Sequence, residues 1–169
     1  MSLLRCTTHL FIGAVICFSL MFVVPTHTHA ASPTMTEAVP EAAEVLRLMN
    51  NLRAANGCGP LTFSPQLTAA ALRQSTDLPK MGDTLSHVGT DGSTFATRIE
   101  QAGYTHFTLA AENIAAGYET PQAAMDGWYN SPLHRANMLN CQLKEVGIGY
   151  VYTDQGDFNY YWTADFGSR

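Results

Sequence analysis

The stretch that decides the fold is Trp128–Asn140, W-Y-N-S-P-L-H-R-A-N-M-L-N. Ser131-Pro132 in its middle combines a helix-capping side chain with a proline suited to a first helical turn. This pair predicts that one helix ends here and another begins. His134 lies just beyond, between apolar neighbours. Histidine is readily used as a ligand or proton carrier near neutral pH, but for a single histidine here, taken alone, core packing is the simpler interpretation.

Two earlier segments hold the groups that would give His134 a function. Ser86-His87-Val88-Gly89 places a second imidazole in a loop rich in Gly, Asp and Thr. Glu112 interrupts an apolar run, where a carboxylate is costly to bury unless it is paired or hydrogen-bonded. A solvated loop residue would explain His87, and a clasp on backbone N–H groups would explain Glu112. Taken together, the three side chains predict two imidazoles and a carboxylate in one cleft.

The first 30 residues have the organisation of a secretory signal peptide. Arg5 precedes an apolar run from Leu10 to Val24, Pro25 breaks the run, and Thr28-His29-Ala30 supplies small residues for cleavage. The run is about 15 residues long, whereas a membrane span needs about 20. A retained anchor is the alternative. We expect residues 1–30 to be removed, leaving no stable membrane span and a secreted protein, extracellular or periplasmic.

The mature chain of about 139 residues is the size of one domain. We expect residues 31–40, rich in small residues and proline, to form a linker, and residues 41–169 to form the domain. Arg5 leaves with the signal, so eight basic side chains face 14 acidic ones and the net charge is −6. The mature sequence has no lysine or arginine cluster, which excludes nucleic acid as an expected partner.

Cys58 and Cys141 are the two cysteines of the mature chain. An even pair in an exported protein predicts one disulfide, with two free buried thiols as the alternative. The bridge would close a loop of about 83 residues. In the chain-entropy model, such a closure stabilises the fold by about 4 to 5 kcal/mol. Two cysteines this far apart do not resemble a zinc knuckle, which needs closely spaced pairs.

Helical patterns come first in the chain and strand patterns come last. Apolar spacing and capping signals predict four helices and a short fifth turn, at 41–55, 65–78, after a Ser93 cap to Gly103, at 121–130, and from Pro132. Residues 107–115 are expected to be partly extended. Alternation at 146–152 and the aromatic run 158–166 predict an antiparallel hairpin. This order favours the α+β class over a βαβ repeat.

In this order and spacing, the segments resemble the signature blocks of the CAP superfamily. That family comprises cysteine-rich secretory proteins, antigen 5 and plant pathogenesis-related-1 proteins, and the resemblance is to its bacterial SCP-like branch. The matching blocks are Ser86-His87-x-Gly89, Glu112-Asn113-Ile114-Ala115, Trp128, Ser131-Pro132-x-His134-Arg135-x-Asn137-Met138-Leu139, Gly147-Ile148-Gly149-Tyr150 and Tyr161-Trp162-Thr163-x-x-Phe166-Gly167. The resemblance covers about residues 42–167. It implies an α-β-α sandwich, in which a small antiparallel sheet lies between helical layers.

The resemblance also implies a cleft lined by His87, Glu112 and His134. The residues expected to support this cleft are Asn113, Trp128 and Ser131. The sequence departs from the family pattern at Ser131, where many eukaryotic members have a second glutamate, and at Ala111, where glycine is usual. We expect His87 and His134 to be the ligands of an optional, weakly bound divalent ion such as zinc. Its binding would weaken at low pH, because protonated imidazoles do not coordinate.

The family resemblance implies binding of an extracellular partner, including sterol or lipid in some members. We therefore expect a small apolar molecule or a cell-envelope component at this cleft. The alternative is a metal-assisted hydrolase of peptide, ester or cell-wall bonds in the same cleft. A serine route through Ser86 or Ser131 with His134 is also open, since only geometry defines a triad. A third interpretation is a stable secreted domain whose cleft has no present function.

Overall fold

The computed structural model describes residues 39–169, so the expected signal peptide and most of the expected linker lie outside the described residues. The elements are α1 Pro40–Ala55, β1 Thr62–Phe63, α2 Pro65–Asp77, the 3-10 helix η1 Leu78–Met81, α3 Phe95–Gln101, β2 Leu109–Ala116, α4 Pro121–Asn130, α5 Pro132–Met138, β3 Glu145–Tyr152 and β4 Tyr160–Ser168. Within residues 39–169, no helix is both long enough and apolar enough to cross a membrane.

Proline in the first turn and a preceding hydroxyl side chain start several of the helices. Ser64 Oγ accepts from the Leu67 N–H at the start of α2. Thr120 Oγ1 accepts from the Ala123 N–H at the start of α4. For α3, the cap is Thr94 rather than the expected Ser93, since Thr94 Oγ1 accepts from the backbone N–H three residues later.

The sheet has four strands in the order β1-β3-β4-β2. β3 and β4 form the predicted antiparallel hairpin, and β2 pairs antiparallel with the other side of β4. β1 pairs with β3 in parallel, so the sheet is mixed rather than purely antiparallel. β1 has only two residues, too few to show a period in the sequence.

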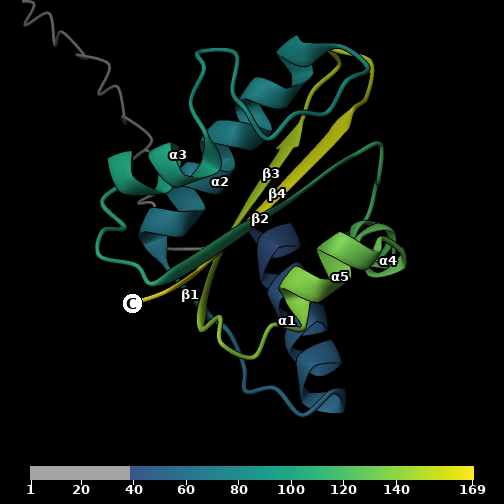
Figure 1. The fold of residues 1–169 in the computed structure, drawn as a ribbon. Coiled ribbons are helices and arrows are strands. Elements are labelled where there is room, and N and C mark those ends of the chain that lie inside the picture. The colour runs from purple at the N-terminus through teal and green to yellow at the C-terminus, as the bar shows by residue number, and fades with distance from the viewer. Residues whose placement is uncertain (1–38) are drawn as a thin grey trace, which may run out of the picture. The chain divides into compact units, whose positions relative to one another are not determined.

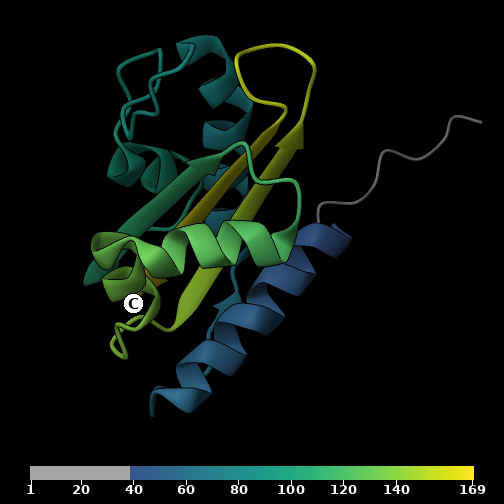
Figure 2. The same ribbon diagram turned by 90° about the vertical axis from the view of Figure 1, so that its right-hand side faces the viewer.

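Helices cover both faces of the sheet, which confirms the predicted α-β-α arrangement (Figure 1). Figure 2 shows α1 and α4 in front of the sheet, with α2 behind it. α5 lies with α1 and α4, and α3 lies with α2. The largest apolar cluster fills the space between the sheet and α1 and α4. Its largest members are Met49, Trp128, Met138, Trp162 and Phe166.

α2 packs on β3 without intervening side chains. A Cβ atom placed on Gly147 would overlap the α2 backbone at Leu67 and Thr68, and one on Gly149 would overlap it at Ala71. The absence of a side chain at these two glycines lets the helix backbone lie directly on the strand. This close approach fixes the level of α2, and therefore of the loop that follows it.

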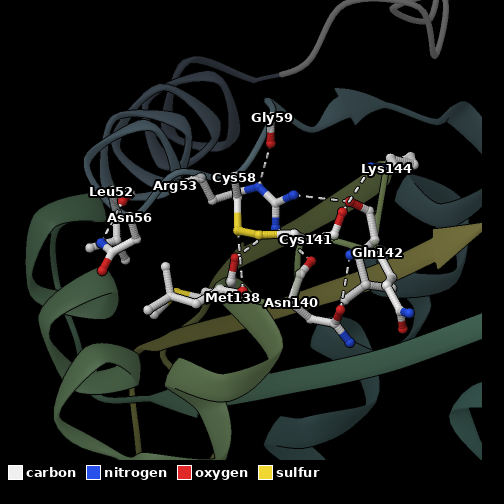
Figure 3. Close-up of a disulfide and its surroundings, with 12 residues drawn as sticks. Leu52, Arg53, Asn56, Cys58, Gly59, Met138, Asn140, Cys141, Gln142 and Lys144 are labelled. Carbon is white, nitrogen blue, oxygen red and sulfur yellow. Dashed lines mark hydrogen bonds between the residues drawn. A yellow bond between two sulfur atoms is a disulfide. The ribbon is translucent and has the colours of Figure 1, made fainter.

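A disulfide and a buried arginine join the loop after α1 to the loop after α5 (Figure 3). The Cys58–Cys141 bridge is the one predicted, and its cysteines are 83 positions apart. Arg53 is fully buried at the end of α1. Its guanidinium donates to four carbonyl oxygens at 2.8–3.0 Å, those of Gly59, Met138, Asn140 and Leu143. Burial lowers the pKa of this guanidinium.

Candidate functional site

The site is built on β2, an edge strand of the sheet. Successive side chains of a strand point to opposite faces, so neighbouring residues of β2 reach different helical layers. Glu112 faces α3, where it pairs with Arg98. Asn113 faces α5, where its Nδ2 donates to the carbonyl of His134 at 3.0 Å. One strand therefore positions groups on both sides of the predicted cleft.

Glu112 is buried, and both of its carboxylate oxygens are occupied. Oε2 accepts from Arg98 Nη2 at 2.6 Å, and each of these two side chains is only 1% exposed. Oε1 lies 2.7 Å from Nδ1 of His87, whose side chain is 49% exposed. Because a carboxylate only accepts, this contact favours the tautomer in which Nδ1–H donates to Glu112, which leaves Nε2 of His87 without a partner among the described contacts.

Contacts to α2 and α3 hold the loop that carries His87. Gln74 Nε2 donates to the carbonyl of Ser86 at 2.7 Å, and Arg98 Nη2 donates to the carbonyl of His87 at 3.2 Å. Further along, the Asp77 carboxylate accepts from both the N–H and the hydroxyl of Thr90. Arg98 thus holds the Glu112 carboxylate and also the backbone of His87, the residue that Glu112 orients.

His134 lies on α5 and is half-buried. Burial lowers the pKa of its imidazole, and the nearby His87 lowers it further. His134 is therefore neutral at pH 7, with a ring nitrogen free to accept a proton or bind an ion. The described contacts join Glu112 to His87 but not to His134. The structure thus places the imidazoles near one another and the carboxylate behind only one of them.

Two side chains of the opening motif cover the outer edge of β2. Trp128 Nε1 donates to the carbonyl of Ile114 at 3.2 Å, and Asn137 Nδ2 donates to that of Glu112 at 3.3 Å. Asn137 also donates to Asn113 Oδ1 at 2.8 Å. An open strand edge invites pairing with another chain. Trp128 and Asn113, expected to support the cleft, therefore fix α4 and α5 against the strand.

A groove of about 260 Å³ lies beside His134. It is lined by Leu85, Ile114, Ala115, Ala116, Tyr118, Gly127, Trp128, Ser131 and His134. Most of this lining is apolar, and His134 supplies its imidazole. Ser131 caps no N–H with its side chain, so its hydroxyl is not needed to start α5.

Asp165 is a part of the site that sequence reasoning missed. It lies on β4 directly opposite Glu112 and is fully buried. Burial raises the pKa of the Asp165 carboxyl well above its ordinary value, and the charge of Glu112 raises it further. The signal was present in the sequence, because Asp165 interrupts an aromatic strand just as Glu112 interrupts an apolar one. Arg98 was also missed, since one arginine in a short helix pattern is unremarkable.

The geometry fits a metal ion only in part. Among residues 39–169, no group of three His, Cys, Asp or Glu side chains is arranged to hold one. What is available is Nε2 of His87, whose other nitrogen is held by a carboxylate, and the neutral imidazole of His134. A carboxylate behind a histidine is the usual support of a metal ligand. Water or a bound ligand would have to complete the coordination.

The family model of the cysteine-rich secretory proteins, CAP, matches residues 46–166, a span that contains every residue of the site. The chain belongs to the CAP family. Among curated relatives, this CAP domain is 32% identical over 141 residues to YkwD of Bacillus subtilis (strain 168), covering 83% of this chain and 51% of YkwD. It is 33% identical over 106 residues to the membrane protein YlbC of the same strain, covering 63% of this chain and 30% of YlbC. The chain therefore spans about half of the first relative and less than a third of the second.

Solved structures agree with the fold of this CAP domain. An extracellular protein of Bacillus anthracis str. Ames that contains a SCP domain is 29% identical with a TM-score of 0.66, over 76% of this chain and 40% of that one. An outer surface protein of Borrelia burgdorferi gives a TM-score of 0.67 over 79% of this chain and 96% of that one. At 24% identity, the second similarity concerns the fold alone.

Proposed function

We propose that this CAP domain is exported and binds a small apolar molecule or a cell-envelope component in the groove beside His134. The polar end of the ligand would face His87 and His134. The observation that supports this most is a mainly apolar groove with the His134 imidazole in its wall, while both oxygens of the Glu112 carboxylate are already engaged by His87 and Arg98. Apolar walls with few polar groups are typical of small-molecule sites.

The size of the groove narrows the ligand class. Pockets for drug-sized ligands run from about 300 to 1,000 Å³. A groove of about 260 Å³ is slightly smaller and takes a short apolar segment rather than a whole lipid. A second apolar groove of about 210 Å³ lies between α1 and α4, lined by Leu48, Leu52, Gln122, Met125, Asp126 and Tyr129. Its lining contains no histidine, so it serves as the internal comparison.

Two observations support export. The disulfide between Cys58 and Cys141 belongs to an oxidising compartment. The Bacillus anthracis and Borrelia proteins that share the fold are described as extracellular and as an outer surface protein. Both agree with the signal peptide expected at residues 1–30. An extracellular ligand is therefore the consistent choice.

The alternative function is a hydrolase in which His87, oriented by Glu112, acts as the general base. His87 is held through Nδ1 by the buried Glu112 and is about half exposed, which is how a carboxylate orients a histidine that acts as a general base through its other nitrogen. Glu112 itself is only 1% exposed and would position the base rather than take the proton. Turnover of a p-nitrophenyl ester, a peptide or peptidoglycan that is lost in His87→Gln would establish this alternative over simple binding.

Defined probes test the binding proposal: octanoate, dihexanoyl phosphatidylglycerol and muramyl dipeptide, each titrated calorimetrically into the mature protein. Ser131→Leu fills the groove without removing a hydrogen bond, and Leu133→Ala is the matched control, since Leu133 is 79% exposed and does not line the groove. We expect one probe class to bind, Ser131→Leu to weaken it at least tenfold, and Leu133→Ala to leave it unchanged. Equal binding by all three proteins would refute the groove as the site.

Zinc is the proposed optional ion, weakly held by His87 and His134. Calorimetry at pH 7.5 should show weaker zinc binding for a His87→Ala/His134→Ala double variant than for the wild type. Binding should also weaken between pH 7 and pH 5, because protons compete for the imidazoles. The same zinc affinity in both proteins would exclude these histidines as the ligands.

A further inference from the structure

Two carboxyl groups share one buried site beneath His87. Glu112 and Asp165 are directly opposed across the antiparallel pair β2 and β4. Side chains opposed in this way point to the same face, with Cβ atoms about 4.5 to 5.5 Å apart. Both residues are buried, Asp165 completely. Two ionised carboxylates at this distance, away from water, would repel one another strongly.

The hydrogen-bonding capacity of the two carboxyl groups also indicates that one of them carries a proton. Both oxygens of Glu112 accept a charged or ring N–H donor, whereas neither oxygen of Asp165 has a donor among the described residues. Ionised carboxylates only accept, so two of them cannot bond to each other. If one carboxyl carries a proton, it donates to the other, and Asp165 gains its partner.

The surrounding groups decide which carboxyl holds the proton. Arg98 is the cation packed against the pair, and its short ion pair is with Glu112. His87 also donates to Glu112. The buried face of α2 contributes only uncharged side chains, Leu67, Ala70, Ala71, Gln74 and Ser75, and β3 places Gly147 opposite Asp165. Glu112 therefore has the donors that a carboxylate needs, whereas Asp165 has none among the described residues, in agreement with the raised pKa of Asp165.

We propose that Asp165 is a positioning residue whose neutral carboxyl donates its proton in a hydrogen bond to Glu112. The Glu112 carboxylate is then held by three donors, Arg98, His87 and Asp165, and is kept aimed at the histidine. The ligand-binding role of His87 rests on the proposed function, but the state of Asp165 does not. Its tests need no ligand, so each proposal can fail separately.

The first test compares the wild type with Asp165→Asn, which keeps a donor and cannot ionise. A carboxyl whose pKa is raised in the folded state favours folding below its ordinary pKa of about 3.9, and loses that contribution as pH rises toward the folded pKa. The ratio of unfolding constants, wild type over Asp165→Asn, should therefore rise by up to tenfold per pH unit above pH 4. A ratio that stays constant from pH 4 to pH 8 would overturn the proposal.

The second test measures positioning. Nitrogen-15 NMR of the imidazoles should show the Nδ1–H tautomer of His87 in the wild type and in Asp165→Asn. Asp165→Val supplies no donor, so its His87 Nδ1–H signal should broaden or disappear through exchange with water. An unchanged signal in folded Asp165→Val would contradict the positioning role. If Asp165→Val does not fold, the pH dependence of Asp165→Asn still decides the question.

Discussion

Arg98 is the residue on which the buried polar part of the site depends. Its guanidinium pairs with Glu112 and also donates to the carbonyls of Ser93 and His87. It therefore connects α3, the histidine loop and β2 through one side chain. A buried charge without its partner is far less stable than the pair, because the remaining ion stays desolvated.

Arg98→Met should therefore lower the free energy of unfolding by about 3 to 5 kcal/mol, since it leaves the Glu112 charge in the interior without its cation. Urea unfolding at pH 7 measures this. The matched control is Arg73→Met, whose ion pair with Asp91 is exposed and screened by solvent. A loss no larger than that of the control would show that Glu112 is not an ionised, arginine-dependent group.

The lowered pKa of His134 makes the stability of the fold decrease as pH falls. Its folded-state pKa lies below the ordinary value, so the unfolded chain takes up the proton first as pH falls. This contribution to stability is present above about pH 6.5 and is lost as pH decreases below it. His134→Gln should therefore lose less stability than the wild type between pH 7 and pH 5, as measured by urea midpoints. Parallel decreases in both proteins would contradict a depressed pKa.

At the residue scale, the sequence pointed to His87, Glu112 and His134 as candidate site residues, because their types are unusual in an apolar loop, strand or turn. It did not point to the side chains that contact Glu112 from other elements. Arg98 and Asp165 act only through Glu112, and their importance comes from a register across two strands that are far apart in sequence. A pattern within one segment contains no information on that register.

At the scale of elements, the decisive contact is between α2 and β3. The α2 backbone lies directly on Gly147 and Gly149, so a residue with a Cβ atom at either position would overlap the helix. The histidine loop follows α2 through η1, and Gln74 and Asp77 of α2 hold it. The distance between helix and strand therefore determines where His87 lies.

Gly147→Ala should force α2 away from the sheet and lower the free energy of unfolding by about 1 to 3 kcal/mol, the usual cost of overpacking. Gly59→Ala is the matched control, because nothing lies within 4 Å of a Cβ at that position. Thermal unfolding of the two variants measures the difference. Equal stability would mean that the helix backbone is free to shift.

Periodicity and caps were sufficient for the long elements. The structure confirms the expected α1, α2 and α4, and the β3–β4 hairpin. α5 was expected only as a short turn, and β1 was not expected at all. Both are short, and β1 exists because the chain after α1 pairs with the first two residues of β3, a tertiary contact with no local signal.

At the scale of the molecule, two restraints join the same pair of loops. The disulfide links Cys58 to Cys141, and Arg53 bonds to carbonyls on both sides of the connection. α5, which carries His134, lies directly before one of these loops. The sequence predicted the disulfide from the cysteine count alone, but Arg53 looked like an ordinary basic residue at a helix end.

Replacing both cysteines with serine should cost about 2 to 5 kcal/mol and leave the protein folded, because Arg53 still holds the loops. Arg53→Met added to the cysteine variant should cost more than the sum of the separate losses, since either restraint partly replaces the other. A double-mutant cycle by urea unfolding measures this coupling. Strict additivity would show that the two restraints act independently.

The most direct test of the central claim is to locate a bound probe. The best binder among octanoate, dihexanoyl phosphatidylglycerol and muramyl dipeptide is titrated into nitrogen-15-labelled mature protein, and amide shifts are followed. We predict that the largest changes fall on the groove lining, at Ile114–Ala116, Ser131 and His134, and on His87, which neighbours His134. Changes confined to the groove between α1 and α4, around Leu48 and Met125, would contradict the account.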